Sequence, residues 1–152
     1  MTHRTVACAA TALAAALTLA LPNQLRAQER IVPEMYQRAY DTYHYAPIVK
    51  VGKTLYLSGI VAGDPDPEQQ FERVFEHLEA VLAEAGADLS NVVEMTTFHV
   101  NMREHIETFI EVKDRHMSQP YPAWTAIGIT ELFSPRALVE VKVTAVLEDD
   151  ES

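Results

Sequence analysis

The stretch 139–147 (VEVKVTAVL) alternates between two kinds of side chain over most of its length. One set is apolar and would share one face of a strand: Val139, Val141, Val143, Ala145 and Leu147. The other set, Glu140, Lys142 and Thr144, would share the opposite face. A period of two residues is typical of a strand that packs one face on a core. We therefore expect a strand over residues 137–147, with Glu140 on its polar face.

Upstream of this strand, one segment has the pattern of an amphipathic helix. Asp66 before Pro67 is a typical helix start, and Gly86 is a typical helix end. Apolar residues recur between them at helical spacing: Phe71, Val74, Phe75, Leu78, Val81, Leu82 and Ala85. These signals predict a helix over residues 67–85.

The remaining elements are predicted from similar patterns. A second helix is expected over residues 103–118, and strands are expected over residues 48–51, 54–62, 92–100 and 123–132. The last two strands are expected to pair around residues 133–136. The order β-β-α-β-α-β-β predicts an α+β fold in which two helices cover one face of a single sheet.

Two helices leave the second face of such a sheet without a cover. The strands near residues 54–58 and 93–100 carry sizeable side chains on both sides. An uncovered face that carries sizeable apolar side chains is typical of a surface that meets another protein chain. We therefore expect a homo-oligomer with pockets formed between chains.

The charge of the chain narrows its possible partners. Residues 28–152 contain 10 basic and 22 acidic side chains, a net charge of −12, because only Arg4 and Arg26 precede them. A nucleic-acid binder needs a basic stripe, and none is present in the sequence. Neither nucleic acid nor an anionic membrane surface is therefore an expected partner. Cys8 is the only cysteine, so residues 28–152 can form no disulfide and carry no thiol nucleophile.

The first 27 residues have the composition of a secretory signal peptide. His3 and Arg4 precede an apolar run at residues 6–21, and Ala27 is a small residue at the expected cleavage point. This interpretation predicts removal of residues 1–27, a mature domain at residues 28–147, an acidic tail at residues 148–152, and a periplasmic or secreted protein. No membrane contact is expected after cleavage. The alternative is an uncleaved N-terminal anchor.

Common catalytic motifs are missing from the sequence. There is no phosphate-binding loop, dinucleotide-binding glycine motif, nucleophile elbow or HExxH zinc motif. His105 and His116 lie eleven residues apart on the second predicted helix, which is about 16 Å along its axis. That separation is too large for one metal ion. We expect both histidines to face solvent and predict no metal site.

Glu140 is the candidate catalytic residue, with two interpretations. If its face of the sheet meets water, Glu140 is an ordinary surface carboxylate. If that face meets a neighbouring chain, Glu140 is a partly buried carboxylate at a cleft and a natural general base.

Three further places are candidates for a binding site, each with a structural alternative. Ser58-Gly59 ends a strand, where glycine lets a ligand approach the backbone closely or simply marks a bulge. Trp124 begins a strand after Pro122-Ala123, and Tyr45 precedes the first strand. Each aromatic ring could line a pocket or serve as ordinary packing.

Several of these stretches, in the same order, resemble the RidA/YjgF family of enamine/imine deaminases. The run from Tyr45-Ala46-Pro47-Ile48 to Ser58-Gly59 is similar to the family's opening strands. The segments 82–86 (LAEAG) and 92–100 (VVEMTTFHV) resemble its centre, and 121–123 (YPA) and 138–146 (LVEVKVTAV) resemble its end. The resemblance covers about residues 44–147.

The resemblance implies a chorismate-mutase-like fold and a homotrimer with a small-molecule ligand in each intersubunit cleft. It implies hydrolysis of 2-imino and 2-amino-enoic acids to 2-oxo acids and ammonia, without a metal or an organic cofactor. Carried over by position, Glu140 matches the acidic residue that orients the attacking water. Tyr45 and Ser58-Gly59 match pocket-lining residues, and Ala126 would offer backbone contacts.

The sequence departs from the active deaminases at Trp124. Those proteins carry an arginine directly after the Pro-Ala step, which binds the substrate carboxylate in a bidentate pair. Tryptophan has one N–H and no charge, so the chain resembles the arginine-lacking branch of the family. We expect an exported RidA-like protein that hydrolyses an imine with an altered substrate range.

Two alternatives to catalysis remain. One is a non-catalytic trimer that binds a small aromatic or apolar ligand in the same clefts, which Trp124 would suit. The other is a holdase-like or purely structural trimer. An endoribonuclease activity, another label of the family, is disfavoured by the net charge and the export signal.

Overall fold

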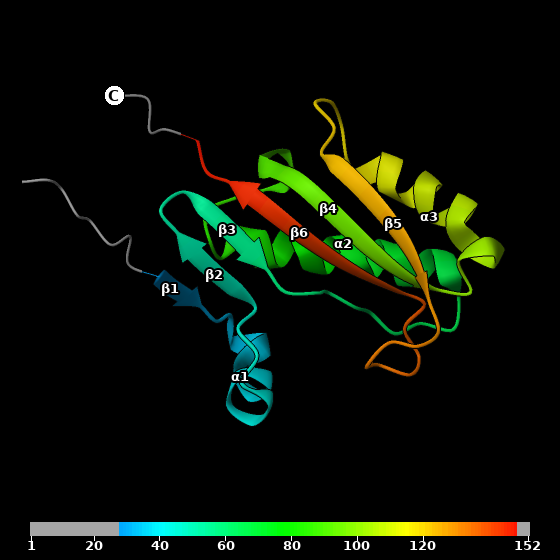
Figure 1. Cartoon of the computed structure of the whole chain (residues 1–152), viewed down its shortest axis with the longest axis horizontal. Coiled ribbons are helices and arrows are strands. Elements are labelled where there is room, and N and C mark those ends of the chain that lie inside the picture. Colours follow the sequence, from blue (N-terminus) through cyan, green and yellow to red (C-terminus); the bar gives the residue numbers. More distant parts are fainter. Residues whose placement is uncertain (1–27, 149–152) are drawn as a thin grey trace, which may run out of the picture.

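The computed structural model describes residues 28–148, which form a six-stranded sheet and three α-helices (Figure 1). The predicted leader at residues 1–27 and residues 149–152 of the predicted tail lie outside the described residues. The elements in chain order are β1 (Gln28–Ile31), α1 (Gln37–Tyr43), β2 (Ile48–Val51), β3 (Thr54–Leu57), α2 (Pro67–Ala83), β4 (Val92–Val100), α3 (Met102–His116), β5 (Ala123–Ile129) and β6 (Val139–Val146). Short 3-10 turns at Glu34–Tyr36 and Leu89–Asn91 precede α1 and β4.

Helix α2 forms where the sequence predicts it. The Asp66 carboxylate accepts a hydrogen bond from the backbone N–H of Gln69 at 3.0 Å, which caps the first turn, and Pro67 occupies the first helical position. Gly86, just past the helix, has the left-handed φ of 71°. The apolar stripe of α2 is buried together with Phe109 and Val112 of α3. Both helices lie on one face of the sheet (Figure 1), which confirms the predicted α+β fold.

The structure adds β1 and α1 at residues 28–43, where the sequence predicted no element. β1 pairs antiparallel with β2, from Gln28 opposite Val51 to Ile31 opposite Ile48. In Figure 1, α1 lies beyond the start of β2, apart from α2 and α3. No residue of α1 is buried, so the hydrophobic periodicity that marks α2 is absent. The only feature of the sequence that indicates this helix is the helical spacing of Tyr36, Tyr40 and Tyr43.

The prediction that the last two strands pair is wrong, because β4 lies between them. The strand order is β1-β2-β3-β6-β4-β5; β4 and β5 run parallel, and every other neighbouring pair is antiparallel. Parallel neighbours need a crossover connection, and α3 supplies it between β4 and β5. β6 then enters between β3 and β4. This insertion places Glu140 inside the sheet and leaves β5 as an edge strand.

The two faces of the sheet differ as the alternation in β6 predicts. Val139, Val141, Val143 and Ala145 are at most 2% exposed and face the helices. Glu140 lies on the other side, which we call the open face; Tyr56, Ile127 and Val146 share this side by register. These three apolar side chains are 50%, 39% and 39% exposed, so the open face carries accessible apolar surface.

Candidate functional site

Glu140 lies beside an interruption in the pairing between β3 and β6. The regular register ends with Tyr56 opposite Thr144, and pairing resumes where Ile60 lies opposite Val141. Residues 57–59 therefore face only residues 142–143, which is a β-bulge. Two backbone hydrogen bonds between Ile60 and Val141, of 2.8 and 2.9 Å, close the far side of the bulge. The bulge brings the backbone of Gly59 against the side chain of Glu140.

Glycine is required at position 59 because the Glu140 side chain occupies the space of a β-carbon. A β-carbon there would lie 2.0 Å from Oε1 of Glu140 and 2.5 Å from its Cγ. Glycine is needed here because another side chain lies so close to the backbone, and not because the backbone adopts a left-handed conformation. The sequence allowed either a bulge or a close approach to the backbone at Ser58-Gly59. The structure shows a bulge, and in it the backbone of Gly59 contacts the candidate catalytic carboxyl group.

Tyr45 and Ser58 lie on the same wall, at the open end of the β2–β3 hairpin. The hairpin pairs Ile48 with Leu57, which sets residues 45–46 beside residues 58–59. The Tyr45 hydroxyl donates to the carbonyl oxygen of Gly59 at 3.1 Å. The Ser58 hydroxyl donates to the carbonyl oxygen of Ala46 at 2.8 Å. These bonds hold both side chains in fixed positions near Glu140.

Tyr45, Ser58, Gly59 and Glu140 line one cavity of about 870 Å³, which we call the Glu140 cavity. Its other walls come from the end of α1, from β2 and from the loop between β5 and β6. Tyr43 of α1 and Phe133 of that loop meet edge to face, with ring centroids 5.7 Å apart. The unpredicted helix α1 thus contributes an aromatic wall to the candidate site.

The cavity shifts the proton affinity of two of its groups. Burial raises the pKa of Glu140 above its usual value, an effect that the nearby charge of Lys142 partly offsets. Burial, together with Tyr36 and Glu140, raises the pKa of Tyr45 to about 12. Tyr45 therefore keeps its proton at neutral pH, and Glu140 is shifted toward the range where a carboxyl can both accept and return a proton.

Trp124 and Ala126 lie on the opposite side of the sheet from Glu140. In the β4–β5 register they stand beside Met95 and Thr97, both of which are buried toward the helices. The indole N–H of Trp124 donates to Oγ1 of Thr97 at 3.0 Å, and its ring lies 6.0 Å from that of Phe109. Within one chain, the structure therefore joins Tyr45, Ser58, Gly59 and Glu140 but not the two β5 residues.

His99 and His105 form a buried pair that the sequence did not reveal. Their ring centroids lie 5.7 Å apart, and Nε2 of His99 is 2.8 Å from Oγ1 of Thr97. Burial is the main cause that lowers the pKa of His99 to about 4, and it also lowers the pKa of His105. Both rings are therefore neutral at pH 7.

The prediction that His105 and His116 face solvent is wrong. His105 is 5% exposed, and the His116 ring stacks on Phe75 of α2 with centroids 5.1 Å apart. The packing of α3 against α2 and the sheet decides which side of the helix is buried. The identity of a single polar residue does not predict whether it lies on that side.

Two further properties apply to residues 28–148. No group of three or more His, Cys, Asp or Glu side chains in this range is placed to hold a metal ion. No helix in the same range is both long enough and apolar enough to cross a membrane.

Known proteins resemble this chain in sequence over most of the described residues. A family model described as "Endoribonuclease L-PSP" matches residues 35–147. RutC family protein YjgH of Escherichia coli (strain K12) is 32% identical over 109 residues, which cover 67% of this chain and 83% of the relative. The 2-iminobutanoate/2-iminopropanoate deaminase of Dermatophagoides farinae is 31% identical over 114 residues, which cover 68% of this chain and 86% of the relative.

Solved structures agree with the sequence comparison. The structure of protein YJGH matches with a TM-score of 0.73 at 29% identity, covering 81% of this chain and 98% of that one. RidA from an Antarctic Psychrobacter species matches with a TM-score of 0.64 at 28% identity, covering 68% of this chain and 88% of that one. The family model matches most of this chain, and the similar proteins and structures are members of the same family. The chain therefore belongs to the RidA/YjgF family.

Proposed function

We propose that this protein hydrolyses an imine or enamine to a carbonyl compound and ammonia in the Glu140 cavity. The observation that carries the proposal is a carboxyl group with a raised pKa, held against the backbone at Gly59 inside a cavity. The 31% identity to a protein named as a 2-iminobutanoate/2-iminopropanoate deaminase supports the same reaction class.

A single carboxyl group can carry every proton transfer that this reaction needs. The Glu140 carboxylate accepts a proton from water as the water oxygen bonds to the carbon of a protonated C=N group. Glu140 returns that proton to the nitrogen of the resulting carbinolamine. The C–N bond then breaks while the hydroxyl proton passes to the carboxylate. Glu140 gives this proton to the departing ammonia, which leaves as ammonium together with the carbonyl compound, and the carboxylate is regenerated.

The walls of the Glu140 cavity favour an apolar substrate. Tyr43 and Phe133 offer aromatic surface, and Val49 and Val61 add aliphatic surface. Trp124, which stands where the active deaminases have their carboxylate-binding arginine, carries no charge. We therefore propose a substrate imine whose binding here does not depend on a carboxylate group.

Binding without catalysis is a second candidate, favoured by the exposed Tyr43–Phe133 pair at the edge of the cavity. Such a pair provides flat apolar surface but takes no part in proton transfer. Ammonia release from a panel of freshly generated imines decides between the two candidates. Saturable binding without ammonia release would leave only the binding function.

We also propose that the protein is a homotrimer assembled through the open face. The exposed Tyr56, Ile127 and Val146 support this, and so does the largely exposed edge strand β5. In such an assembly, β5 of one copy, with Trp124 and Ala126, could approach the Glu140 cavity of a neighbour. This arrangement would place the ligand in the intersubunit cleft.

Light scattering at micromolar concentration should give about three times the mass of the mature chain. Ile127→Arg should dissociate the trimer, because it places a charge in the buried interface. Ile110→Arg is a matched control on α3, since Ile110 is 37% exposed and Ile127 is 39% exposed. A stable wild-type monomer would contradict the proposal.

We further propose export of the protein with removal of residues 1–27. The support is the basic start, the apolar run and the small residue at the predicted cleavage point. N-terminal sequencing of exported protein should therefore begin near Gln28. An intact Met1 on membrane-bound protein would favour the anchor instead.

A further inference from the structure

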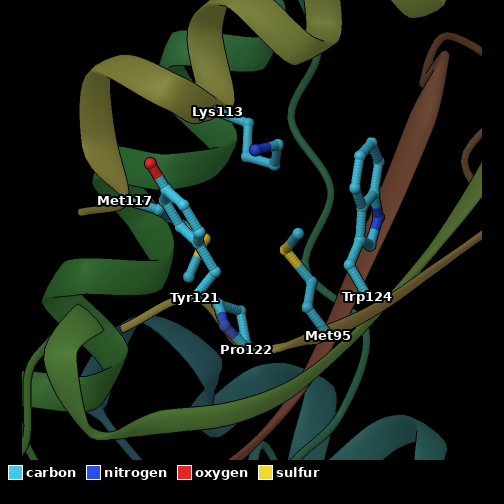
Figure 2. Close-up of a pocket in the computed structure, with 6 residues that line it drawn as sticks. All are labelled: Met95, Lys113, Met117, Tyr121, Pro122 and Trp124. Carbon is cyan, nitrogen blue, oxygen red and sulfur yellow. The ribbon is translucent and has the colours of Figure 1, made fainter. Parts of the chain in front are cut away.

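A second cavity, of about 210 Å³, lies on the helix face of the sheet, beside Trp124. Figure 2 shows the six residues that line it, which come from β4, α3, β5 and the segment between α3 and β5: Met95, Lys113, Met117, Tyr121, Pro122 and Trp124. We call this cavity the Trp124 pocket. Apart from Trp124, which occupies the position of the deaminases' arginine, none of these residues takes part in the hydrolysis proposed above.

Lys113 reaches from α3 across the Trp124 pocket, between the rings of Tyr121 and Trp124 (Figure 2). Its Nζ atom lies 5.1 Å from the ring centroid of Trp124 and 5.9 Å from that of Tyr121. A cation is attracted to the faces of aromatic rings, so both rings favour this position of the ammonium group. The Lys113 side chain is only 13% exposed. The structure therefore contains a mostly buried positive charge at the wall of an apolar cavity.

The ammonium group of Lys113 can bind a further anion. It forms an ion pair with Asp114, the next residue along the helix, whose own side chain is 59% exposed. An ammonium group has three N–H donors, and Asp114 accepts one of them. Ion pairs with an exposed partner are weak because water competes with them. An anion inside the pocket would meet less competition from water.

The rest of the Trp124 pocket suits a flat apolar group. The indole N–H of Trp124 is already donated to Thr97, so the ring offers apolar surface to the cavity. Met95 and Met117 lie beside it, and thioether side chains adapt to the shape of a bound group and contact aromatic rings favourably. Tyr121 is 63% exposed and forms the outer wall.

We propose that the Trp124 pocket binds a small carboxylate that has one flat apolar ring, and that Lys113 supplies the positive charge for it. The volume fits this class of ligand. It exceeds the cavity of roughly 150 Å³ that holds benzene and is smaller than the roughly 300 Å³ at which sites for drug-sized ligands begin. The proposal goes beyond imine hydrolysis, because within one chain the pocket lies on the other face of the sheet from Glu140 and its charge comes from Lys113, which the hydrolysis does not use.

The tryptophan itself reports on binding. Trp124 is the only tryptophan in the chain, so a change in tryptophan emission reports on the surroundings of this residue, and the Lys113 variants show whether the ligand lies in this pocket. Titration of the mature protein with phenylacetate should give a saturable emission change. Phenylacetamide has nearly the same shape without the charge and should bind about tenfold more weakly, because hydrogen bonds between charged groups are stronger than neutral ones.

Variants of Lys113 identify the charge that binds the ligand. Lys113→Met should weaken phenylacetate binding about tenfold and remove the difference between the two ligands. Lys113→Arg keeps the charge and should preserve the preference for phenylacetate. Lys53→Met, the same change at an exposed lysine in the turn between β2 and β3, should leave binding unaltered.

Three results would overturn the proposal. The first is equal binding of phenylacetate and phenylacetamide to the wild type. This comparison uses no variant, so it does not depend on whether a variant folds. The second is no saturable emission change with either ligand. The third is a folded Lys113→Met variant that binds phenylacetate as the wild type does. Glu140→Gln should leave phenylacetate binding intact, so this site and the hydrolytic site can fail independently.

Discussion

Glu140→Gln should lower the rate of ammonia release from the best imine substrate about 100-fold or more, because general acid–base catalysis contributes roughly 10²- to 10⁴-fold. Glutamine has nearly the same shape, so it can occupy the same space beside Gly59 but cannot accept the proton from water. Steady-state ammonia release measures the effect. Glu111→Gln, on the exposed surface of α3, is the matched control and should retain wild-type activity.

The same substitution should not destabilise the protein. Because burial raises the pKa of Glu140, the folded state binds its proton more tightly than the unfolded state does. Its contribution to stability is therefore greatest at low pH and is lost as the pH rises through the raised pKa. A neutral glutamine avoids that loss, so at neutral pH the variant should melt at the wild-type temperature or above. An inactive variant that is also unfolded would not support a catalytic role.

The pH dependence of the wild type provides a further check on Glu140. The carboxylate form is the base, so activity should fall as the pH drops through the pKa of Glu140. Since that pKa is raised, the decline should lie at higher pH than for an ordinary carboxyl group. An active Glu140→Gln variant with an unchanged pH profile would place the chemistry elsewhere.

Gly59→Ala should lower both stability and activity, because a β-carbon would lie 2.0 Å from Oε1 of Glu140. Overpacking typically costs about 1–3 kcal/mol, and the carboxyl group must rotate away from its present position. A displacement of about 1 Å can cost 100-fold in rate, so we expect ammonia release to fall tenfold or more. Melting temperature and ammonia release measure the two effects separately.

Gly63→Ala is the matched control for this substitution. A β-carbon at Gly63 would meet nothing within 4 Å, so the variant should behave like the wild type. A double-mutant cycle tests the cause of the Gly59 effect. In a Glu140→Ala background the obstructing side chain is gone, so Gly59→Ala should cost much less stability. Equal costs in both backgrounds would show that the two residues are not in contact.

The sequence was sufficient to predict the parts of the structure that depend on local periodicity and local hydrogen bonds. The apolar stripe and Asp66 cap of α2 and the alternation in β6 predicted the α+β fold correctly, and the quoted stretches identified the family. The alternation also predicted the face on which Glu140 lies. These features depend on side chains a few residues apart, so each is encoded within one short segment.

Only the tertiary structure decided which segments meet. The insertion of β6 between β3 and β4 and the bulge at residues 57–59 bring Gly59 to Glu140, and β-strand pairing of this kind is chosen by contacts distant in sequence. The same is true of Lys113 and Trp124, which meet because α3 packs beside β5. The separation of Trp124 from Glu140 follows from the register of β5 beside β4 and of β4 beside β6. The alternation within one strand shows which of its residues share a face. Whether residues of two strands lie on the same face depends on how the strands are aligned, and a shift of one residue reverses it.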